Sequence, residues 1–507
     1  MRNTNVLSTL LAFLLCCLSL VKAESHFDIG RKLSQRDEGT GNKYPAKSHA
    51  RRVAKQLNLT EGLIYLNGEQ FRNNEDSDMP AFFRQKRYFY YLTGYDYPDA
   101  HVTYDIKADI LTIWILKPDP KEVLWSGPSP TPQSILLAHD VDMANYTSDG
   151  LNTTIIAYAS ANPSAKIHIL HNYFPPIPSE LRSFCDNTKL QYAIDVCRVV
   201  KDDYEIELIR RATEISSQAH TKIMSQIDLM TSERDIEAMF ISECIRRGAK
   251  KLAYDTIACS GKNNAILHYV KNDQELEGKQ LVLIDAAAEY GLYASDITRT
   301  FPINGRFTKE AAEIYSLVYE MQQTVFKMVK PGVKWRDCHL AAADVALDGL
   351  MKLGVLTGNK TEIVKSQIIG KVFFPHGLGH GVGLEVHDTL YSELISAGPS
   401  SRGKRTPVLA LRDFDAYTEK EIHNLLKPNM VITAEPGIYF NQPLYEDYLN
   451  TFPNSTKYIN EKVLAKYWDV GGVRIEDCIR VTENGFENLT TAPKKIVDIE
   501  RIARSRR

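Results

Sequence analysis

Acidic residues and histidines in the second half of the chain lie where apolar runs end, a placement that favours chemistry. Asp285 ends the apolar run at residues 281–284, and Asp296 follows after a Tyr290-Gly291 turn. An apolar run, a turn and a second run predict a hairpin that brings the two carboxylates together. A single Asp in such a place is more often an ordinary turn residue, so the pair depends on support from other segments.

The segment 373–388 carries three of the chain's 13 histidines, His376, His380 and His387, among four glycines. Glycines allow the backbone to approach a ligand closely. A lone histidine is usually structural, but histidine is also the commonest metal ligand and a frequent catalytic base. The cluster therefore favours a metal-binding or catalytic loop.

Two more carboxylates are expected in buried strands. Glu435 follows the apolar run 431–434 just before a Pro-Gly turn, and Glu476 is predicted to lie inside a strand within residues 471–479. Burying a carboxylate is costly unless a cation compensates its charge. Four acids and one histidine in apolar settings therefore predict a metal centre with mostly oxygen ligands. Two divalent ions, Mn²⁺ before Zn²⁺, suit such a set, and a pair of ions that activates water indicates hydrolysis.

Strands alternate with helices before these segments. Residues 51–57 are predicted to be helical, residues 62–66 and 111–116 are predicted strands, and the Pro-rich residues 127–132 form a loop that leads into a helix. This alternation predicts an α/β domain over residues 46–195.

A long amphipathic helix begins at residues 205–212, and a second is predicted over residues 232–247 with Ser232 and Asp235 at its capped start. We place the domain boundary near residue 196. Residues 196–507 form one α+β unit that carries all the candidate chemistry.

The composition excludes some partners. The 507 residues include 61 Lys and Arg against 63 Asp and Glu, for a net charge of −2. No basic excess exists to follow a phosphate backbone, so we expect no nucleic-acid partner.

The first residues are predicted to be a secretory signal. Arg2 precedes an apolar stretch at residues 6–21, and small residues lead up to a cleavage site after Ala23. A signal anchor and a mitochondrial presequence are the alternatives, but the run is short for a span and too apolar for a transit peptide. The segment 24–45 would be a polar leader. We expect no membrane association after cleavage.

Sequons and cysteines agree with this compartment. Asn-x-Ser/Thr acceptor sites for N-glycosylation occur at Asn58, Asn145, Asn152, Asn359, Asn454 and Asn488. The mature chain would be a glycoprotein of the extracellular space or of a vacuolar or lysosomal lumen. Its six cysteines contain no C-x-x-C pair, so no structural zinc site and no disulfide is assigned.

The acidic and histidine segments resemble the pita-bread metallopeptidases, the family of methionine aminopeptidase, aminopeptidase P and prolidase. The motifs that carry the resemblance are I-D-A, S-D-I-T-R-T-F, H-G-L-G-H, E-P-G-I-Y and V-R-I-E-D. The resemblance implies five metal ligands, namely Asp285, Asp296, His380, Glu435 and Glu476. Residues 83–94 and 124–127 are similar to the N-terminal domain of the proline-specific branch. The resemblance of both halves therefore implies a pita-bread catalytic domain, of α+β class, preceded by a smaller α/β domain.

The resemblance also assigns roles. Asp296 and Glu476 would bridge two divalent ions, with Mn²⁺ first and Zn²⁺ or Co²⁺ as alternatives, and Glu435 would move the proton. Further residues would contact the substrate: His268 and His387 at the carbonyl, and His376, Tyr254 and Arg474 around them. Relatives of this kind commonly form homodimers, which we expect here.

One position departs from the prolidase pattern. Prolidases have an arginine that holds the free carboxylate of a dipeptide, and Glu421 stands there, with Lys420 or Arg412 as substitutes. The expected function is prolidase-like hydrolysis of the Xaa-Pro bond at the N-terminus of dipeptides or short peptides. The alternatives are an aminopeptidase P that acts on longer peptides, a non-catalytic pita-bread binding protein, and a metal-free, creatinase-like hydrolase.

Overall fold

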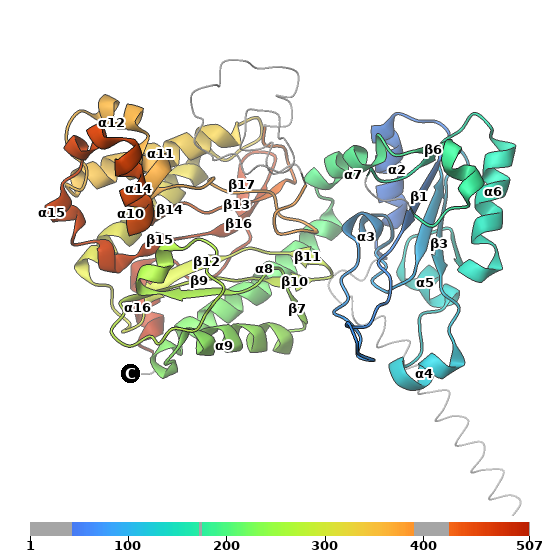
Figure 1. The fold of residues 1–507 in the computed structure, drawn as a ribbon, viewed down its shortest axis with the longest axis horizontal. Helices are drawn as coiled ribbons and strands as arrows, with labels where there is room; N and C mark the ends of the chain where they lie inside the picture. The colour runs from blue at the N-terminus through green and yellow to red at the C-terminus, as the bar shows by residue number, and fades with distance from the viewer. Residues whose placement is uncertain (1–42, 172–174, 390–424, 506–507) are drawn as a thin grey trace, which may run out of the picture. The chain divides into compact units, whose positions relative to one another are not determined.

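The computed structural model describes residues 43–171, 175–389 and 425–505 (Figure 1). The predicted signal and leader lie outside these residues, as do Arg412, Lys420 and Glu421. The chain divides into two compact units, Met1–Ile194 and Asp195–Arg507, at a point within helix α7 (Leu190–Val199).

The first unit is built on one mixed six-stranded sheet. In order across the sheet, its strands are β4 (Met143–Tyr146), β3 (Ile110–Ile115), β2 (His101–Asp105), β1 (Leu63–Asn67), β5 (Ile167–His168) and β6 (Cys185–Asp186). Strand β2 is antiparallel to β1 and β3. The other neighbours pair in parallel: β3 with β4, β1 with β5, and β5 with β6.

Helices separate most of these strands, in keeping with the α/β prediction, although β3 directly follows β2. They are α2 (Ala46–Leu57), α3 (Arg87–Thr93), α4 (Pro120–Ser126), α5 (Pro132–Ala138), η2 (Thr147–Asp149), α6 (Leu151–Ala161) and η3 (Ser179–Phe184). Leu63, Trp114 and Ile167 of the sheet form a buried cluster with Leu151 and Ile155 of α6.

The second unit opens with two helices whose ends the sequence marks clearly. Helix α8 (Asp203–Met224) has a capping box between Asp202 and Glu205, and α9 (Glu233–Arg246) has one between Ser232 and Asp235. The later helices are η4 (Ile227–Leu229), η5 (Gly261–Ala265), α10 (Lys309–Met328), α11 (Trp335–Lys352), α12 (Lys360–Ser366), η6 (Ile369–Phe373), α14 (Gln442–Thr451), η8 (Pro453–Tyr458), α15 (Glu461–Leu464), η9 (Trp468–Val470) and α16 (Ile496–Ala503).

Short antiparallel ladders make up the rest of this unit. One contains β12 (Thr298–Pro302), β9 (Leu281–Asp285) and β8 (Ile257–Ser260), and another β11 (Tyr293–Ala294), β10 (Ala288–Tyr290) and β7 (Lys251–Leu252). The others are β13 (Val431–Ala434) with β16 (Asp477–Val481) and β17 (Phe486–Asn488), and β14 (Gly437–Tyr439) with β15 (Gly472–Arg474).

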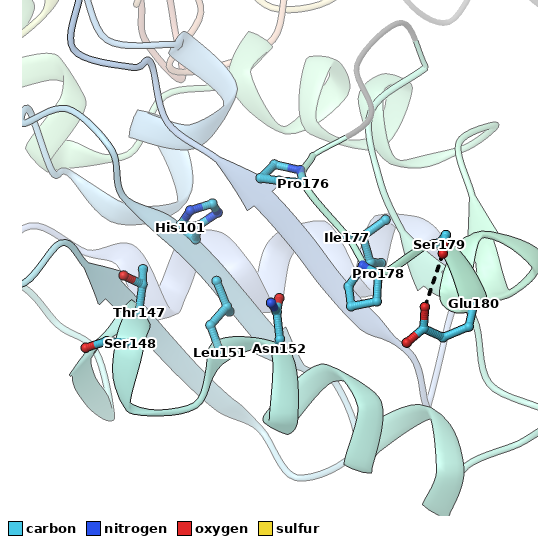
Figure 2. A pocket seen from close by; sticks show the side chains of 10 residues that line it. All are labelled: His101, Thr147, Ser148, Leu151, Asn152, Pro176, Ile177, Pro178, Ser179 and Glu180. Atoms are coloured by element: carbon cyan, nitrogen blue, oxygen red, sulfur yellow. Dashed lines mark hydrogen bonds between the residues drawn. The ribbon is translucent and has the colours of Figure 1, made fainter.

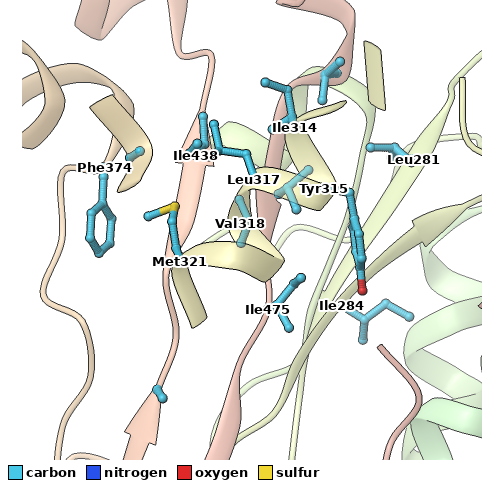
Figure 3. Packing of buried hydrophobic residues seen from close by; sticks show 14 of the residues in the cluster. Leu281, Ile284, Ile314, Tyr315, Leu317, Val318, Met321, Phe374, Ile438 and Ile475 are labelled. Atoms are coloured by element: carbon cyan, nitrogen blue, oxygen red, sulfur yellow. The ribbon is translucent and has the colours of Figure 1, made fainter. Parts of the chain in front are cut away.

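Helix α10 packs against the strands that lead to the acidic residues (Figure 3). Its buried positions Ile314, Leu317, Val318 and Met321 follow the helical period, so they form one apolar face. That face belongs to the same core cluster as Leu281, Ile284, Ile438 and Ile475 on or beside the strands. The strand ends are therefore held on a close-packed support, which fixes what projects from them.

In the described part of the chain, helices lack the combination of length and apolar character that a membrane span requires.

Candidate metal centre

The first two carboxylates come together as the hairpin predicts. Asp285 is the last residue of β9 and pairs with Thr298 of β12, and Asp296 lies just before β12. Gly291, with φ 54°, forms the turn between β10 and β11. The hydroxyl of Tyr254 lies 2.6 Å from Asp285 Oδ1 and in a short contact with Asp296 Oδ1. Tyr254, expected in the substrate pocket, therefore bridges two of the acids.

Helix α8 anchors the same hairpin. The Ser216 hydroxyl lies 2.9 Å from that of Ser295, and it accepts a 2.8 Å hydrogen bond from the backbone N–H of Ala288. All three residues are buried. These buried hydrogen bonds with Ser216 of α8 thus hold both sides of the hairpin between Asp285 and Asp296 in place.

The glycine-rich histidine loop lies along strand β13. The backbone N–H of His380 donates to Thr433 Oγ1 at 2.9 Å, and the N–H of Thr433 returns a 2.8 Å bond to the carbonyl of His380. Gly379 is required here because a Cβ would overlap the carbonyl of Thr433. Thr433 Oγ1 also donates to Glu435 Oε1 at 3.2 Å. One threonine therefore positions a histidine and an acid.

Glu476 corrects one prediction. It lies between β15 and β16, not inside a strand, because the chain leaves its pairing with β14 and joins β13 at this point. Its backbone N–H bonds to the carbonyl of Thr298 at 3.1 Å, and Thr298 Oγ1 donates to Glu476 Oε2 at 2.6 Å. The residue is 1% exposed, so its carboxylate is directed into the interior.

Arg474 holds a neighbouring carboxylate, as predicted. Its Nη2 donates to Asp285 Oδ2 at 2.7 Å, and its Nε donates to Thr298 Oγ1 at 3.1 Å. Its Nη1 donates to the hydroxyl of Tyr439 at 2.9 Å, and that hydroxyl lies 2.8 Å from His376 Nε2. Arg474 is therefore a buried support for the acids.

The potential ligand atoms converge. One ligand atom each from Asp296, His380 and Glu476 lies within 4.8 Å of the others, and all three residues are buried. His380 Nε2 lies 3.3 Å from Asp296 Oδ2 and 3.4 Å from Glu435 Oε1. Glu435 thus joins the group through His380, and Asp285 joins it through Tyr254. Direct contacts therefore link all five predicted ligands, three of which converge at one buried point.

The charges at this point favour the binding of a cation. Burial, followed by repulsion from the other acids, raises the pKa of Glu476 well above its usual value and raises that of Asp296. Burial raises the pKa of Glu435 to about 7. For His380, burial acts in the lowering direction, but the hydrogen bond and charge of Asp296 and the charge of Glu435 raise its pKa to about 9. Clustered carboxylates with one imidazole fit divalent ions that prefer oxygen ligands.

The metal-free protein should therefore lose stability as the pH rises from about 7 to about 9. The folded state keeps protons on Glu476 and His380 that the unfolded chain has already released, so the free energy of unfolding falls with pH. His376 and His387, whose pKa values burial lowers to about 3, act in the opposite direction only below pH 6.5. Thermal unfolding of the chelated protein measures this. A Tm that rises over the interval would contradict it.

Two of the three other predicted site histidines lie next to predicted metal ligands. The ring centroid of His387 lies 4.1 Å from that of His380, and His376 Nδ1 lies 3.9 Å from Glu435 Oε2. His268 is exposed, and its charge contributes to lowering the pKa of both His376 and His387. His387 is neutral near pH 7 and is able to donate a hydrogen bond without adding charge.

The sequence analysis missed two buried carboxylates beside this site. Asp388, next to His387, accepts from Arg198 Nη2 at 2.7 Å and from Lys201 Nζ at 3.0 Å. Its backbone N–H closes the loop on the carbonyl of Gly381 at 2.9 Å. The only local sign of a functional role for Asp388 is its position directly after His387. Its two cationic partners lie nearly two hundred residues earlier in the chain, where no local pattern links them to it.

The second missed residue is Glu233, which is 0% exposed. It accepts hydrogen bonds from Ser260 Oγ at 2.6 Å, from the hydroxyl of Tyr269 at 2.8 Å and from the N–H of Gln274 at 3.0 Å. Tyr269 directly follows His268, so Glu233 fixes the segment that carries this histidine. Nothing in the local pattern around Glu233 separates it from an ordinary first-turn glutamate.

Comparison with known proteins identifies this arrangement. The model of metallopeptidase family M24 matches residues 207–483, and that of the aminopeptidase P N-terminal domain matches residues 49–168. The chain belongs to metallopeptidase family M24. It has the pita-bread fold with the N-terminal domain of the aminopeptidase P branch, so the predicted family and fold are confirmed.

Individual relatives point to the same branch. A probable Xaa-Pro aminopeptidase of Pyrenophora tritici-repentis is 45% identical over 94% of this chain and 71% of its own length. One from Metarhizium acridum is 43% identical over 90% of this chain and 93% of its own. Among solved structures, the Pseudomonas aeruginosa aminopeptidase PepP matches with a TM-score of 0.73 at 27% identity, over 91% of this chain and 99% of that one.

An Escherichia coli aminopeptidase P structure with the inhibitor Pro-Leu matches equally well, with a TM-score of 0.73, 27% identity and coverage of 92% and 100%. The M24 chain described here is thus a metallopeptidase of the Xaa-Pro aminopeptidase type. M24 peptidases use a dinuclear metal centre, and this chain has candidate ligands for one. The relatives favour aminopeptidase P over the prolidase-like specificity that the sequence analysis put first.

Proposed function

We propose that this protein is a dinuclear metal-dependent aminopeptidase that releases the N-terminal residue of peptides with proline in second place. The convergence of Asp296, His380 and Glu476 at one buried point carries this proposal. Asp285, Asp296, His380, Glu435 and Glu476 would hold the ions, and Mn²⁺ suits this oxygen-rich set. When bound, the ions supply a low-pKa water and a polarised carbonyl.

The chain's own groups would then handle the substrate. Glu435, a carboxylate beside His380, would accept a proton from the attacking water and deliver it to the departing proline nitrogen. His387 and His268 donate hydrogen bonds to the carbonyl oxygen as it gains charge. Arg474 and Tyr254 keep the acids in place through the contacts described above.

A matched set of peptides tests the specificity. Full-length enzyme loaded with Mn²⁺ should cleave Gly-Pro-Pro faster than Gly-Pro, and should leave Gly-Ala-Pro intact. A preference for Gly-Pro would restore the dipeptidase alternative. Release of glycine from Gly-Ala-Pro at a similar rate would contradict proline specificity. Metal content measured on the same sample tests the number and kind of ions.

Glu233→Gln should lower kcat/KM by about 10- to 100-fold, the range seen when a buried partner of a functional side chain is removed. A glutamine has one acceptor oxygen for three donors, so Tyr269 and the neighbouring His268 lose their fixed position. Steady-state kinetics on Gly-Pro-Pro measure this. Glu275→Gln on the same segment, where the side chain is 65% exposed, is the matched control. Equal kinetics in the two variants would contradict the role.

We also propose that the protein enters the secretory pathway and forms homodimers. The signal-like residues 1–23 and the sequons support secretion. Leu124 and Trp125 of α4, 80% and 82% exposed, support self-association because large apolar side chains are rarely left in water together. Sequencing the N-terminus of secreted protein, which should begin at Glu24, and sedimentation analysis test the two proposals.

A further inference from the structure

The first unit contains a cavity of about 790 Å³, lined by residues outside the candidate metal centre (Figure 2). It lies at the edge of the sheet where parallel strands β4 and β5 end and where antiparallel β2 begins with His101. In open α/β sheets, ligands bind outside the carboxyl ends of the parallel strands. The cavity is also within the size range of small-molecule sites.

The lining of this cavity is amphipathic. Pro176, Ile177 and Pro178 form an apolar wall, and Thr147 and Ser179 add hydroxyls. The imidazole of His101 is neutral near pH 7 because burial lowers its pKa to about 4, and its Nδ1 lies 3.1 Å from the hydroxyl of Tyr65. A pyranose ring has the matching character, since its C–H face packs on apolar side chains while its hydroxyls exchange hydrogen bonds.

One lining residue is itself an acceptor site for sugar. Asn152, in the first turn of α6, begins the sequon Asn152-Thr153-Thr154. Figure 2 places its side chain between His101 and the wall formed by Ile177 and Pro178, and the residue is exposed. The cavity and the sequon are independent observations that coincide at this amide.

Other sequons are built differently. The Nδ2 of Asn488 donates to buried Asp477 Oδ2 at 2.7 Å, so a sugar on that nitrogen would break a core contact. Asn359 caps helix α12 through its Oδ1, which accepts from the N–H of Glu362. This contact does not use the Nδ2, the atom to which a sugar would be attached. Asn454 is exposed at the start of η8 and does not line the cavity. Of the four sequons compared, only Asn152 lies among the lining residues of this cavity.

We propose that Asn152 carries an N-linked glycan whose first sugar residues lie in this cavity. In the transfer, Asn152 Nδ2 forms a bond to the anomeric carbon of a lipid-diphosphate-linked oligosaccharide. The bond from that carbon to the phosphate oxygen breaks, and the lipid diphosphate leaves as the amide nitrogen gives up a proton. The inference rests on the proposed secretory route, which supplies the donor. The glycan would fill this edge of the sheet.

Glycopeptide mass spectrometry of full-length protein secreted from a eukaryotic host tests occupancy. Asn152 and Asn454 should both be modified, and Asn488 should not. Modification of Asn454 without Asn152 would overturn this inference and leave the secretory route standing. A chain that keeps its signal-like residues and carries no glycan would overturn both.

The rate of enzymatic trimming tests whether the cavity holds the sugar. In the native protein, an endoglycosidase that cuts between the first two sugars should remove the Asn152 glycan about tenfold more slowly than the Asn454 glycan, since access requires local opening. The two rates should become equal after denaturation. Ser148→Trp, which fills the cavity rim, should make the native rates equal as well.

Two further variants keep the test independent of that substitution. Thr154→Ala removes the sequon but retains Asn152, and it should lower the Tm of the secreted protein. Asn454→Gln removes an exposed glycan and should leave the Tm unchanged. Equal trimming rates in the native wild-type protein would show a glycan in solvent and overturn the proposal.

Discussion

Glu476→Gln should reduce kcat/KM on Gly-Pro-Pro by about 10³-fold, which corresponds to about 4 kcal/mol of transition-state stabilisation. The carboxylate lies 1% exposed at the point where the ligand atoms of Asp296 and His380 converge. A neutral amide is a weaker ligand for a divalent cation than a carboxylate, so the variant should also bind less metal. The measurements are steady-state kinetics and the metal content of the purified protein.

The same substitution should make the metal-free protein more stable at about pH 9. Without a cation, Glu476 is a buried acid with a strongly raised pKa, and its ionisation opposes folding as the pH rises. Asp469→Asn, at a position 73% exposed a few residues earlier, should change neither activity nor stability. Full activity in Glu476→Gln, or a lower Tm than the wild type under chelation, would contradict the assignment.

Asp388→Asn should cost about 3–5 kcal/mol of unfolding free energy, because it leaves two buried cations without their counter-ion. Arg198, Lys201 and Asp388 have side chains that are 2–3% exposed. Gly383 contributes to this packing, since a Cβ there would overlap the Asp388 carboxylate. Activity should fall in addition, because Asp388 closes the loop that carries His387. Urea unfolding of the metal-loaded enzyme measures the loss.

An exposed ion pair provides the comparison. Glu362→Gln removes the partner of Lys365, and both of these side chains are about half exposed. Such pairs contribute about 0–1 kcal/mol, so this variant should unfold close to the wild type. If Asp388→Asn were equally mild, the ion pair would not hold the histidine loop.

Local patterns predicted a large part of this site. The hairpin between Asp285 and Asp296 follows from a turn between two apolar runs, and both acids meet at Tyr254. The capped start of α9 follows from Ser232 and Asp235. Each of these signals lies within about a dozen residues, where side-chain period and turn chemistry act directly.

Long-range pairing is what the patterns could not supply. Glu476 was expected inside a strand because apolar residues occur on both sides of it within residues 471–479. Only the exchange of partners from β14 to β13 puts it at a junction. Asp388 and Glu233 looked like ordinary acids until the fold brought distant partners to them. The direction of strand β2, which is antiparallel to both of its neighbours, also depends on long-range pairing that local patterns do not reveal.

The position of Glu476 at that junction has a consequence for the lifetime of the protein. The position of its carboxylate depends on the pairing of β15 with β14 and of β16 with β13. A shift of register in either pair would therefore displace the carboxylate. Ions that bind only the intact arrangement stabilise both ladders by mass action. In a medium where divalent ions are scarce, the protein should therefore be degraded sooner as well as work more slowly.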